Sequence, residues 1–260
     1  MMKIGFLSQH FTVKERASAK LANDSLVWLA FSSGDELQEA LRRSDVIATF
    51  LPLKTIPTIR DETTVAAAVL RVAAAYHLLV APEGLEEMAI LKLKKNAVIS
   101  VKNALEAAQI CDYRPDIQTV YGRESGFEAS LALEYDLNEE QILAKAATIK
   151  LDETEFIAAP AEGLFVLLCA KNKLEAVRSL RQFNDAKLVE ISNIERRVLQ
   201  LIGDLKATGK LGVRCACDKN GNYHLWACWC EQANLPPNYI KISQSTRTGL
   251  AEAAVKKLGF

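Results

Sequence analysis

Short apolar runs and amphipathic segments alternate along the first two thirds of the chain. The apolar runs have the lengths and flanking turn residues of strands, and the amphipathic segments have the period of helices. Predicted strands cover residues 3–7, 25–31, 46–51, 77–81, 97–101 and 117–121, and predicted helices cover residues 13–21, 33–43 with its Ser33 cap, 85–94 and 104–110. This alternation is typical of α/β layers, and we expect a largely parallel core.

The pattern changes after Asp185. A long amphipathic helix is expected at 191–206, then a hairpin in LGVRCACDKNGNYHLWACWC (211–230) and a last helix at 246–258. Asn220-Gly221 is a strong signal for a two-residue hairpin loop. With that loop, one face of the hairpin would carry Cys215, Cys217, His224, Trp226, Cys228 and Cys230.

Four cysteines and a histidine on one face could bind zinc or a softer metal. Alternatively, these cysteines are buried core residues, because cysteine is often buried and one face of this sheet must pack against the helices of its own domain. The Cys-x-Cys spacing also sets neighbouring ligands in a line and not at tetrahedral corners. We therefore predict reduced, metal-free packing residues at Cys215, Cys217, Cys228 and Cys230, with a metal patch that includes His224 as the alternative.

Composition narrows the function classes. The 260 residues are enough for two or three small domains, and a net charge of zero argues against nucleic acid or an anionic membrane as partner. The start, MMKIGFLSQHF, lacks the features of a signal peptide, and the most apolar region, 64–82, is broken by Arg71 and His77 and fits two strands better than a membrane span. Six cysteines, with two Cys-x-Cys pairs, fit a reducing compartment. We predict a cytoplasmic protein.

Several common catalytic and nucleotide-binding motifs are absent. The sequence has no Walker loop, no Gly-x-Gly-x-x-Gly after a strand and no Gly-x-Ser-x-Gly elbow. His10, His77 and His224 are scattered, so no histidine pair stands at metal-binding spacing.

One long stretch resembles a known family. Residues 114–147, RPDIQTVYGRESGFEASLALEYDLNEEQILAKAA, are similar without a gap to a central segment of hydroxymethylbilane synthase (porphobilinogen deaminase). Shorter anchors follow in the family's order: Ser44-Asp45-Val46, PLKTIPT at 52–58, Ala159 to Gly163, and Glu195-Arg196-Arg197. The resemblance implies two α/β domains of the periplasmic-binding-protein type and a small C-terminal α+β domain. We expect domain 1 at 1–75 with a return segment at 155–172, domain 2 at 76–154 and domain 3 at 173–260.

The residues that would carry the family's chemistry are mostly replaced. The family attaches a dipyrromethane cofactor to a cysteine, but the matching turn holds Ala207 and Thr208. The position of the catalytic carboxylate is Thr55, and the double-arginine loop aligns with Leu105-Glu106. These losses predict no conversion of porphobilinogen, and no cofactor unless the chain is still an enzyme.

Four residues remain ligand-binding candidates under this resemblance: Lys54, Lys102, Asn103 and Arg123. Arg123 either faces a cleft or is a solvated loop residue paired with Glu124 or Glu128. Lys54 either binds a ligand or lies on the surface.

The resemblance leaves three functions open. The first is a catalytically degenerate member of this tetrapyrrole-biosynthesis family that binds a small molecule or a protein partner. The alternative is a divergent active deaminase that makes hydroxymethylbilane. The third is an interaction protein with a collapsed cleft. Whether the chain is an enzyme, which ligand or partner it binds and its oligomeric state do not follow from the sequence, and no nucleic acid or membrane is expected as a partner.

Overall fold

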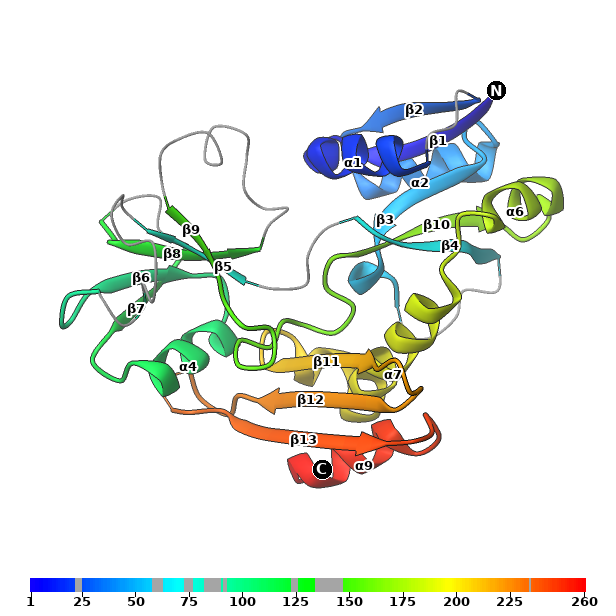
Figure 1. The fold of residues 1–260 in the computed structure, drawn as a ribbon. Coiled ribbons are helices and arrows are strands. Elements are labelled where there is room, and N and C mark those ends of the chain that lie inside the picture. The colour runs from blue at the N-terminus through cyan, green and yellow to red at the C-terminus, as the bar shows by residue number, and fades with distance from the viewer. Residues whose placement is uncertain are drawn as a thin grey trace. The chain divides into compact units, whose positions relative to one another are not determined.

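The structure is a computed structural model of the chain. It describes residues 1–21, 25–57, 63–72, 77–81, 90, 93–122, 126–133, 147–233 and 235–260. The chain forms two compact units. Unit 1 comprises Met1–Ala74 and Glu162–Glu190, and unit 2 comprises Ala75–Ala161 and Ile191–Phe260. Each is described separately (Figure 1).

Unit 1 is built on a five-stranded sheet with the order β2-β1-β3-β10-β4. The strands are β1 (Met2–Leu7), β2 (Leu26–Phe31), β3 (Ala48–Pro52), β4 (Thr64–Arg71) and β10 (Leu164–Ala170). β1 pairs in parallel with β2 and β3, whereas β10 lies between β3 and β4 and is antiparallel to both. The helices are η1 (Ser8–His10), α1 (Phe11–Leu21), α2 (Gly34–Arg43), η2 (Leu53–Thr55) and α6 (Leu174–Arg181).

The core of unit 1 is apolar and aromatic. Phe50 of β3 stacks on Phe165 of β10 with ring centroids 4.8 Å apart, and both side chains are fully buried. The predicted cap of α2 is confirmed, because the Ser33 hydroxyl oxygen accepts a hydrogen bond from the Glu36 amide. At the other end of α2, Ser44 closes the helix in the left-handed conformation.

Unit 2 contains a second five-stranded sheet, with the order β7-β6-β8-β5-β9. The strands are β5 (His77–Ala81), β6 (Val98–Val101), β7 (Gln118–Tyr121), β8 (Ala129–Leu133) and β9 (Ala147–Lys150), and α4 (Ala104–Tyr113) follows β6. Most of the predicted helix at 85–94 lies outside the described residues.

The expectation of a largely parallel core is wrong. Each five-stranded sheet has two parallel and two antiparallel pairings. The physical reason is the direction in which one inner strand enters each sheet: β10 runs against both its neighbours in unit 1, and β5 does so in unit 2. Apolar runs predict that strands exist but do not fix their direction. The sheets are therefore mixed, within the predicted α/β class.

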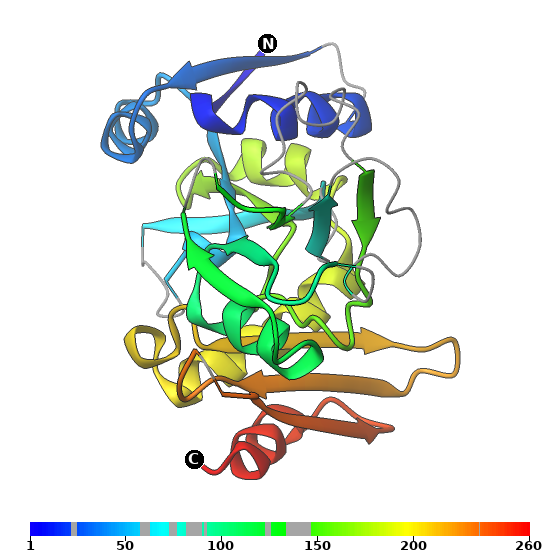
Figure 2. The ribbon, with the colours of Figure 1, turned by 90° about the vertical axis from the view of Figure 1, so that its left-hand side faces the viewer.

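Unit 2 also contains the antiparallel sheet β11-β12-β13, formed by β11 (Leu211–Cys217), β12 (Tyr223–Trp229) and β13 (Asn238–Gln244). One face packs on the final helix α9 (Leu250–Leu258) and on the unit 2 part of α7 (Ala186–Ile202), which enters unit 2 at Ile191 (Figure 2). The predicted helix at 191–206 is interrupted by Gly203, which has φ +100°, and the short α8 (Asp204–Ala207) follows. β13 was not predicted.

The predicted register of the β11–β12 hairpin is wrong. Asp218 Oδ1 accepts hydrogen bonds from the amides of Asn220 (2.9 Å) and Asn222 (2.8 Å), and Gly221 adopts φ +84°. This Asx-type turn makes the loop one residue longer than the predicted two-residue Asn-Gly turn. Cys217 therefore pairs with Tyr223, and not with His224.

The shift by one residue divides the predicted cysteine face. Cys215 and Cys217 point with Leu225 into the helix-covered core. His224, Trp226, Cys228 and Cys230 lie on the other face, since side chains alternate along a strand. The grouping of Cys215, Cys217, His224, Trp226, Cys228 and Cys230 on one face is therefore wrong.

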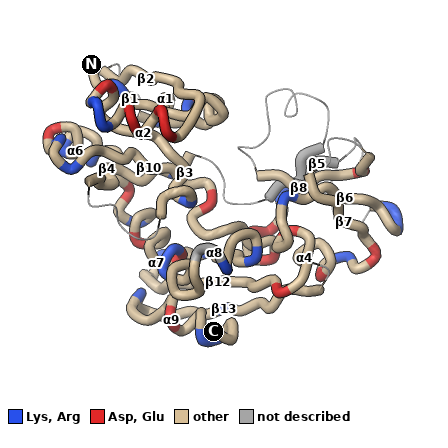
Figure 3. Tube along the Cα trace, turned by 180° about the vertical axis from the view of Figure 1, so that it is seen from behind, with Lys and Arg blue, Asp and Glu red and all other residues tan. Residues whose placement is uncertain are grey.

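The division into three domains stays a prediction. The fold class is as predicted: an α/β protein with two α/β sheets of the periplasmic-binding-protein type and a smaller α+β portion at the C-terminal end. Basic and acidic residues are interspersed in both units (Figure 3). No helix among the described residues is long and apolar enough to cross a membrane.

Candidate functional site

The candidates in unit 1 are held by local contacts. Lys54 Nζ lies 2.9 Å from Oε1 and 3.1 Å from Oε2 of the buried Glu162 carboxylate. The neighbouring Thr55 hydroxyl donates to the Pro52 carbonyl at 2.8 Å. Lys54 therefore neutralises a buried acid of its own unit, which gives this residue a structural role.

Lys102 and Asn103 lie at the N-terminus of α4. Asn103 Oδ1 accepts from the Glu106 amide at 3.0 Å, while the Glu106 carboxylate accepts from the Lys102 amide (2.7 Å) and from Asn103 Nδ2 (3.0 Å). The Leu105 amide donates to the Gly209 carbonyl at 2.9 Å. This capping box satisfies the amides that a bound anion would need.

The N-terminus of α2 in unit 1 has the same arrangement. The Glu36 carboxylate accepts from the Ser32 amide at 3.2 Å and from the Ser32 hydroxyl at 2.6 Å. These hydrogen bonds lower the Glu36 pKa, so the group stays ionised at the positive end of the helix. In both helices, the amides of these hydrogen bonds are therefore satisfied within the protein.

The remaining candidates do not form a site in the described part of the chain. Arg123 lies outside the described residues. Ala207 ends α8, and Thr208 follows in the turn that leads to β11.

The cysteines and His224 have local partners. The Cys230 thiol lies 3.3 Å from the Ala104 carbonyl, and burial raises the Cys228 pKa. His224 Nδ1 lies 2.8 Å from Ser243 Oγ, and its Nε2 lies 3.3 Å from Asp218 Oδ2. Among the described residues, no group of three His, Cys, Asp or Glu side chains is placed to hold a metal ion.

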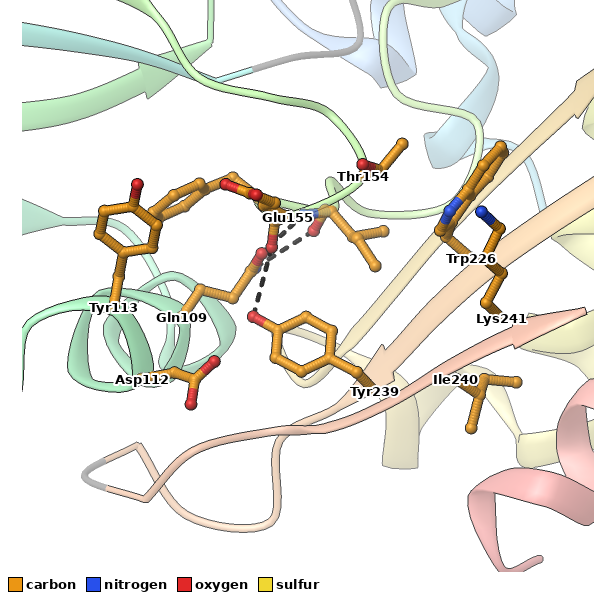
Figure 4. Close-up of a pocket in the computed structure, with 11 residues that line it drawn as sticks. Gln109, Asp112, Tyr113, Thr154, Glu155, Trp226, Tyr239, Ile240 and Lys241 are labelled. Atoms are coloured by element: carbon orange, nitrogen blue, oxygen red, sulfur yellow. Dashed lines mark hydrogen bonds between the residues drawn. The ribbon is translucent and has the colours of Figure 1, made fainter. Parts of the chain in front are cut away.

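A pocket of about 470 Å³ lies within unit 2, between α4, the segment 154–157 and the outer face of the three-stranded sheet (Figure 4). Its volume is in the range of small-molecule sites. The lining residues are Gln109, Asp112, Tyr113, Thr154, Glu155, Phe156, Ile157, Trp226, Tyr239, Ile240 and Lys241.

Helical and strand periodicity bring these side chains together. Gln109, Asp112 and Tyr113 are three and four residues apart on α4, so they share one side of the helix. Tyr239 and Lys241 alternate to the same face of β13. Strand pairing places Tyr239 beside Cys228, and Lys241 beside Trp226.

Buried hydrogen bonds fix one wall of the pocket. Gln109 is fully buried; its Nε2 donates to the Ile157 carbonyl at 3.2 Å, and its Oε1 accepts from the Ile157 amide at 2.6 Å. The Tyr239 hydroxyl donates to the Glu155 carbonyl at 3.3 Å. Because both main-chain groups of Ile157 are satisfied by one side chain, the segment is held against α4 without sheet pairing.

Charge is distributed unevenly along the pocket. The pKa of Tyr239 is raised, mainly by burial and to a smaller extent by the thiol of Cys228 and the carboxylates of Asp112 and Glu155. The Tyr239 hydroxyl therefore remains a neutral donor. Lys241 Nζ lies 5.2 Å from the centroid of the Trp226 ring. Figure 4 shows Asp112 and Tyr113 at one end of the pocket and Trp226 with Lys241 at the other.

Three charged groups of the pocket lack an ion-pair partner among the described residues. They are Asp112, Glu155 and Lys241. By contrast, Arg214, which pairs with Trp226 across the sheet, is held 2.9 Å from Glu153 Oε1. The pocket thus combines aromatic walls with charges that are open to a ligand.

This pocket was not predicted from the sequence. A usable signal was present in α4, where Gln109, Asp112 and Tyr113 put polar and aromatic groups on one side of an otherwise apolar helix. The alternation in NYIKISQ could also have predicted β13. Trp226 was predicted only to share a face of the hairpin with Cys215 and Cys217, which is wrong.

Comparison with known proteins shows a similarity of fold. No protein-family model and no curated protein match the sequence. A solved structure from Clostridium difficile, described as the "substrate binding domain of putative molybdenum ABC transporter", matches with a TM-score of 0.50 and 12% identity, over 73% of this chain and 95% of that one. The match establishes the shared fold.

Two further solved structures are similar at lower scores. A periplasmic substrate-binding protein of an ABC transporter from Coxiella burnetii has a TM-score of 0.44 and 13% identity, over 78% of this chain and 98% of that one. A lipoprotein of the YaeC family from Enterococcus faecalis has a TM-score of 0.41 and 10% identity, over 75% of this chain and 96% of that one.

These comparisons overturn the predicted identity. The Clostridium difficile structure that shares the fold is described as the substrate binding domain of a putative transporter, and no family model or curated protein matches, so the recognition of hydroxymethylbilane synthase is wrong. Three predictions that depended on this resemblance are therefore wrong as well: the degenerate-synthase function, the active-deaminase alternative and the assignment to porphyrin or heme biosynthesis.

The physical reason is that the matched motifs carry local structure that many α/β proteins share. Ser44 is the left-handed cap of α2. Arg114 Nε lies 2.7 Å from Asp116 Oδ1, and Arg114 Nη1 donates to the Ile90 carbonyl at 2.7 Å, which fixes the turn before β7. Cap and turn residues recur wherever the same geometry is needed.

The predicted cytoplasmic location is also wrong against these comparisons. The Clostridium difficile structure that shares the fold is described as the substrate binding domain of a putative ABC transporter. The six cysteines predict a reducing compartment, but buried thiols do not distinguish a reducing from an oxidising one. Cys169, Cys215, Cys228 and Cys230 are buried, and burial raises the Cys169 pKa to about 11. A buried protonated thiol reacts slowly in either compartment.

Proposed function

We propose that this protein binds a small organic molecule in the pocket of unit 2, and that it does so outside the cytoplasm. The observation that carries the proposal is the presence of aromatic walls and three open charges around one pocket of about 470 Å³. The Clostridium difficile neighbour supports it, because that protein of the same fold is described as a substrate-binding domain. A membrane transporter that receives the ligand belongs to the same proposal.

The aromatic walls supply most of the expected affinity. Among the lining residues, Phe156 is buried, Tyr113 and Tyr239 are partly exposed, and Trp226 is half-buried. A planar ligand would cover this surface and gain roughly 25 cal/mol for each Å² of apolar area removed from water. The charged groups would then orient the ligand.

The test is a thermal-shift screen of small metabolites, followed by isothermal titration of those that stabilise the full chain. Trp226→Ala and Tyr239→Ala should each weaken binding at least about tenfold, as expected for the loss of an aromatic contact. Tyr121→Ala is the matched control, because Tyr121 is 52% exposed and is not part of the pocket lining. Binding that survives both pocket substitutions unchanged would overturn the proposal.

A further inference from the structure

We infer that the ligand of this pocket is a small zwitterion with an ammonium group at one end, an anionic group at the other end and a planar middle. The inference rests on the proposed function, since it assigns a chemical class to the occupant of the same pocket. It follows from the positions of the charged and aromatic side chains along the pocket (Figure 4).

The α4 end of the pocket suits an ammonium group. Asp112 belongs to α4 and lines the pocket, and the main-chain carbonyl of Glu155 accepts from the Tyr239 hydroxyl at 3.3 Å (Figure 4). Neither carboxylate is paired with a basic side chain in the described part of the chain. An ammonium group would gain charge-assisted hydrogen bonds from these carboxylates and a cation–π contact with Tyr113 or Tyr239.

The opposite end suits an anion. Lys241 stands over the Trp226 ring at 5.2 Å, and no described carboxylate pairs with it. Arg214 is paired with Trp226 on the neighbouring strand, but its Nη2 lies 2.9 Å from Glu153 Oε1, so its charge is neutralised by that carboxylate. Of the charged residues that line the pocket, Lys241 is the one that lies beside Trp226 at this end.

The middle of the pocket suits a planar group. Phe156 and Ile157 are buried lining residues, with 3% and 1% of their surfaces exposed, and the Phe156 ring lies 5.5 Å from the Tyr113 ring. The Gln109 amide is fully engaged by the Ile157 backbone and does not compete for ligand hydrogen bonds. Tyr239 and Trp226, two residues and one strand apart on the same sheet face, supply flat surfaces for stacking.

Simpler ligand classes leave charges unmatched. A plain anion would meet Asp112 and Glu155, and a plain cation would leave Lys241 unpaired. A neutral ligand would cover all three charges without pairing them, which costs desolvation energy.

The experiment uses para-aminomethylphenylacetate, which carries an ammonium group and a carboxylate on opposite ends of a ring. Two probes each lack one charge: para-methylphenylacetate lacks the amine, and para-methylbenzylamine lacks the acid. Their dissociation constants for the full chain are measured by isothermal titration. We expect the zwitterion to bind about tenfold more tightly than either singly charged probe, as two exposed charge pairs would give.

Charge variants assign the two ends. Asp112→Asn should weaken the zwitterion and para-methylbenzylamine about fivefold and leave para-methylphenylacetate unchanged. Lys241→Gln should weaken the zwitterion and para-methylphenylacetate by a similar factor and leave the amine unchanged. Glu175→Gln and Lys256→Gln remove exposed charges outside the pocket and should change nothing.

The outcomes separate this inference from the proposed function. If para-methylbenzylamine binds as tightly as the zwitterion and Lys241→Gln has no effect, the inference is overturned while binding in the pocket stands. Failure of the zwitterion to bind at millimolar concentration overturns the inference as well. If every bound probe is insensitive to Trp226→Ala, the pocket is not the site and both proposals fail.

Discussion

At the scale of single residues, one buried carboxylate joins two separate parts of unit 2. Glu195 of α7 is 5% exposed; its Oε2 accepts from the Ala161 amide at 2.8 Å, and its Oε1 accepts from the Cys215 amide at 2.8 Å. Ala161 adopts φ +61°, a conformation that costs energy for a residue other than glycine. Glu195 therefore stabilises a strained turn by satisfying its amide.

Glu195→Ala should lower the free energy of unfolding by roughly 2–5 kcal/mol, because two buried amides lose their acceptor. Urea unfolding followed by circular dichroism measures the loss. The matched control is Glu252→Ala, which removes an exposed carboxylate 3.0 Å from Arg197 and should cost less than about 1 kcal/mol. Equal losses in the two variants would show that the buried acceptor has no special role.

At the scale of elements, the β11–β12 turn decides which side chains reach the pocket. The Asp218 carboxylate accepts from the side chain and amide of Asn222 and from the Asn220 amide. These bonds set the register that turns Trp226 toward the pocket and Cys215 toward the core. A two-residue turn would have placed Trp226 on the same face as Cys215.

The hydrogen bonds from Asn222 are the main reason that the Asp218 pKa falls from 3.8 to about 2. Because the folded pKa is below that of the unfolded chain, the stabilisation is complete above about pH 4 and is lost as pH falls toward 2. Asp218→Asn keeps the shape but should reduce the loss of stability between pH 4 and pH 2. Urea unfolding across this range tests it, with the exposed Asp45→Asn as control. An unchanged acid dependence in Asp218→Asn would contradict the assignment.

At the scale of the whole molecule, the chain is divided between two units with separate cores. Leu167 of β10 is fully buried in unit 1, and Leu225 of β12 is fully buried in unit 2. β10 lies between β3 and β4 in the sheet, but in the sequence it follows β5 to β9, which belong to unit 2. Unit 1 is therefore discontinuous in sequence, and its sheet requires both of its segments.

Separate cores predict separate cooperative unfolding. Leu167→Ala should cost roughly 2–5 kcal/mol and should lower amide hydrogen-exchange protection in β1, β3 and β4. Leu225→Ala, the matched substitution in unit 2, should cost a similar amount and lower protection in β11 to β13. Loss of protection throughout the chain in both variants would show that the two units unfold together.

The sequence by itself determined the local structure and the α/β class. The apolar runs located most of the strands, and the Ser33 cap located the start of α2, because these signals depend on neighbouring residues alone. The same local character explains the wrong family: Ser44 and Arg114 matched a motif while serving as a cap and a turn residue.

Only the tertiary structure decided strand direction, hairpin register and the pocket. The direction of β10 depends on where the chain returns. The hairpin register depends on Asp218, whose carboxylate accepts from the amides of Asn220 and Asn222. The pocket draws on α4, the segment 154–157, β12 and β13, which are far apart in sequence. Its unpaired charges become visible only when these segments are folded together, because a charge is known to lack a partner only when its neighbours in space are known.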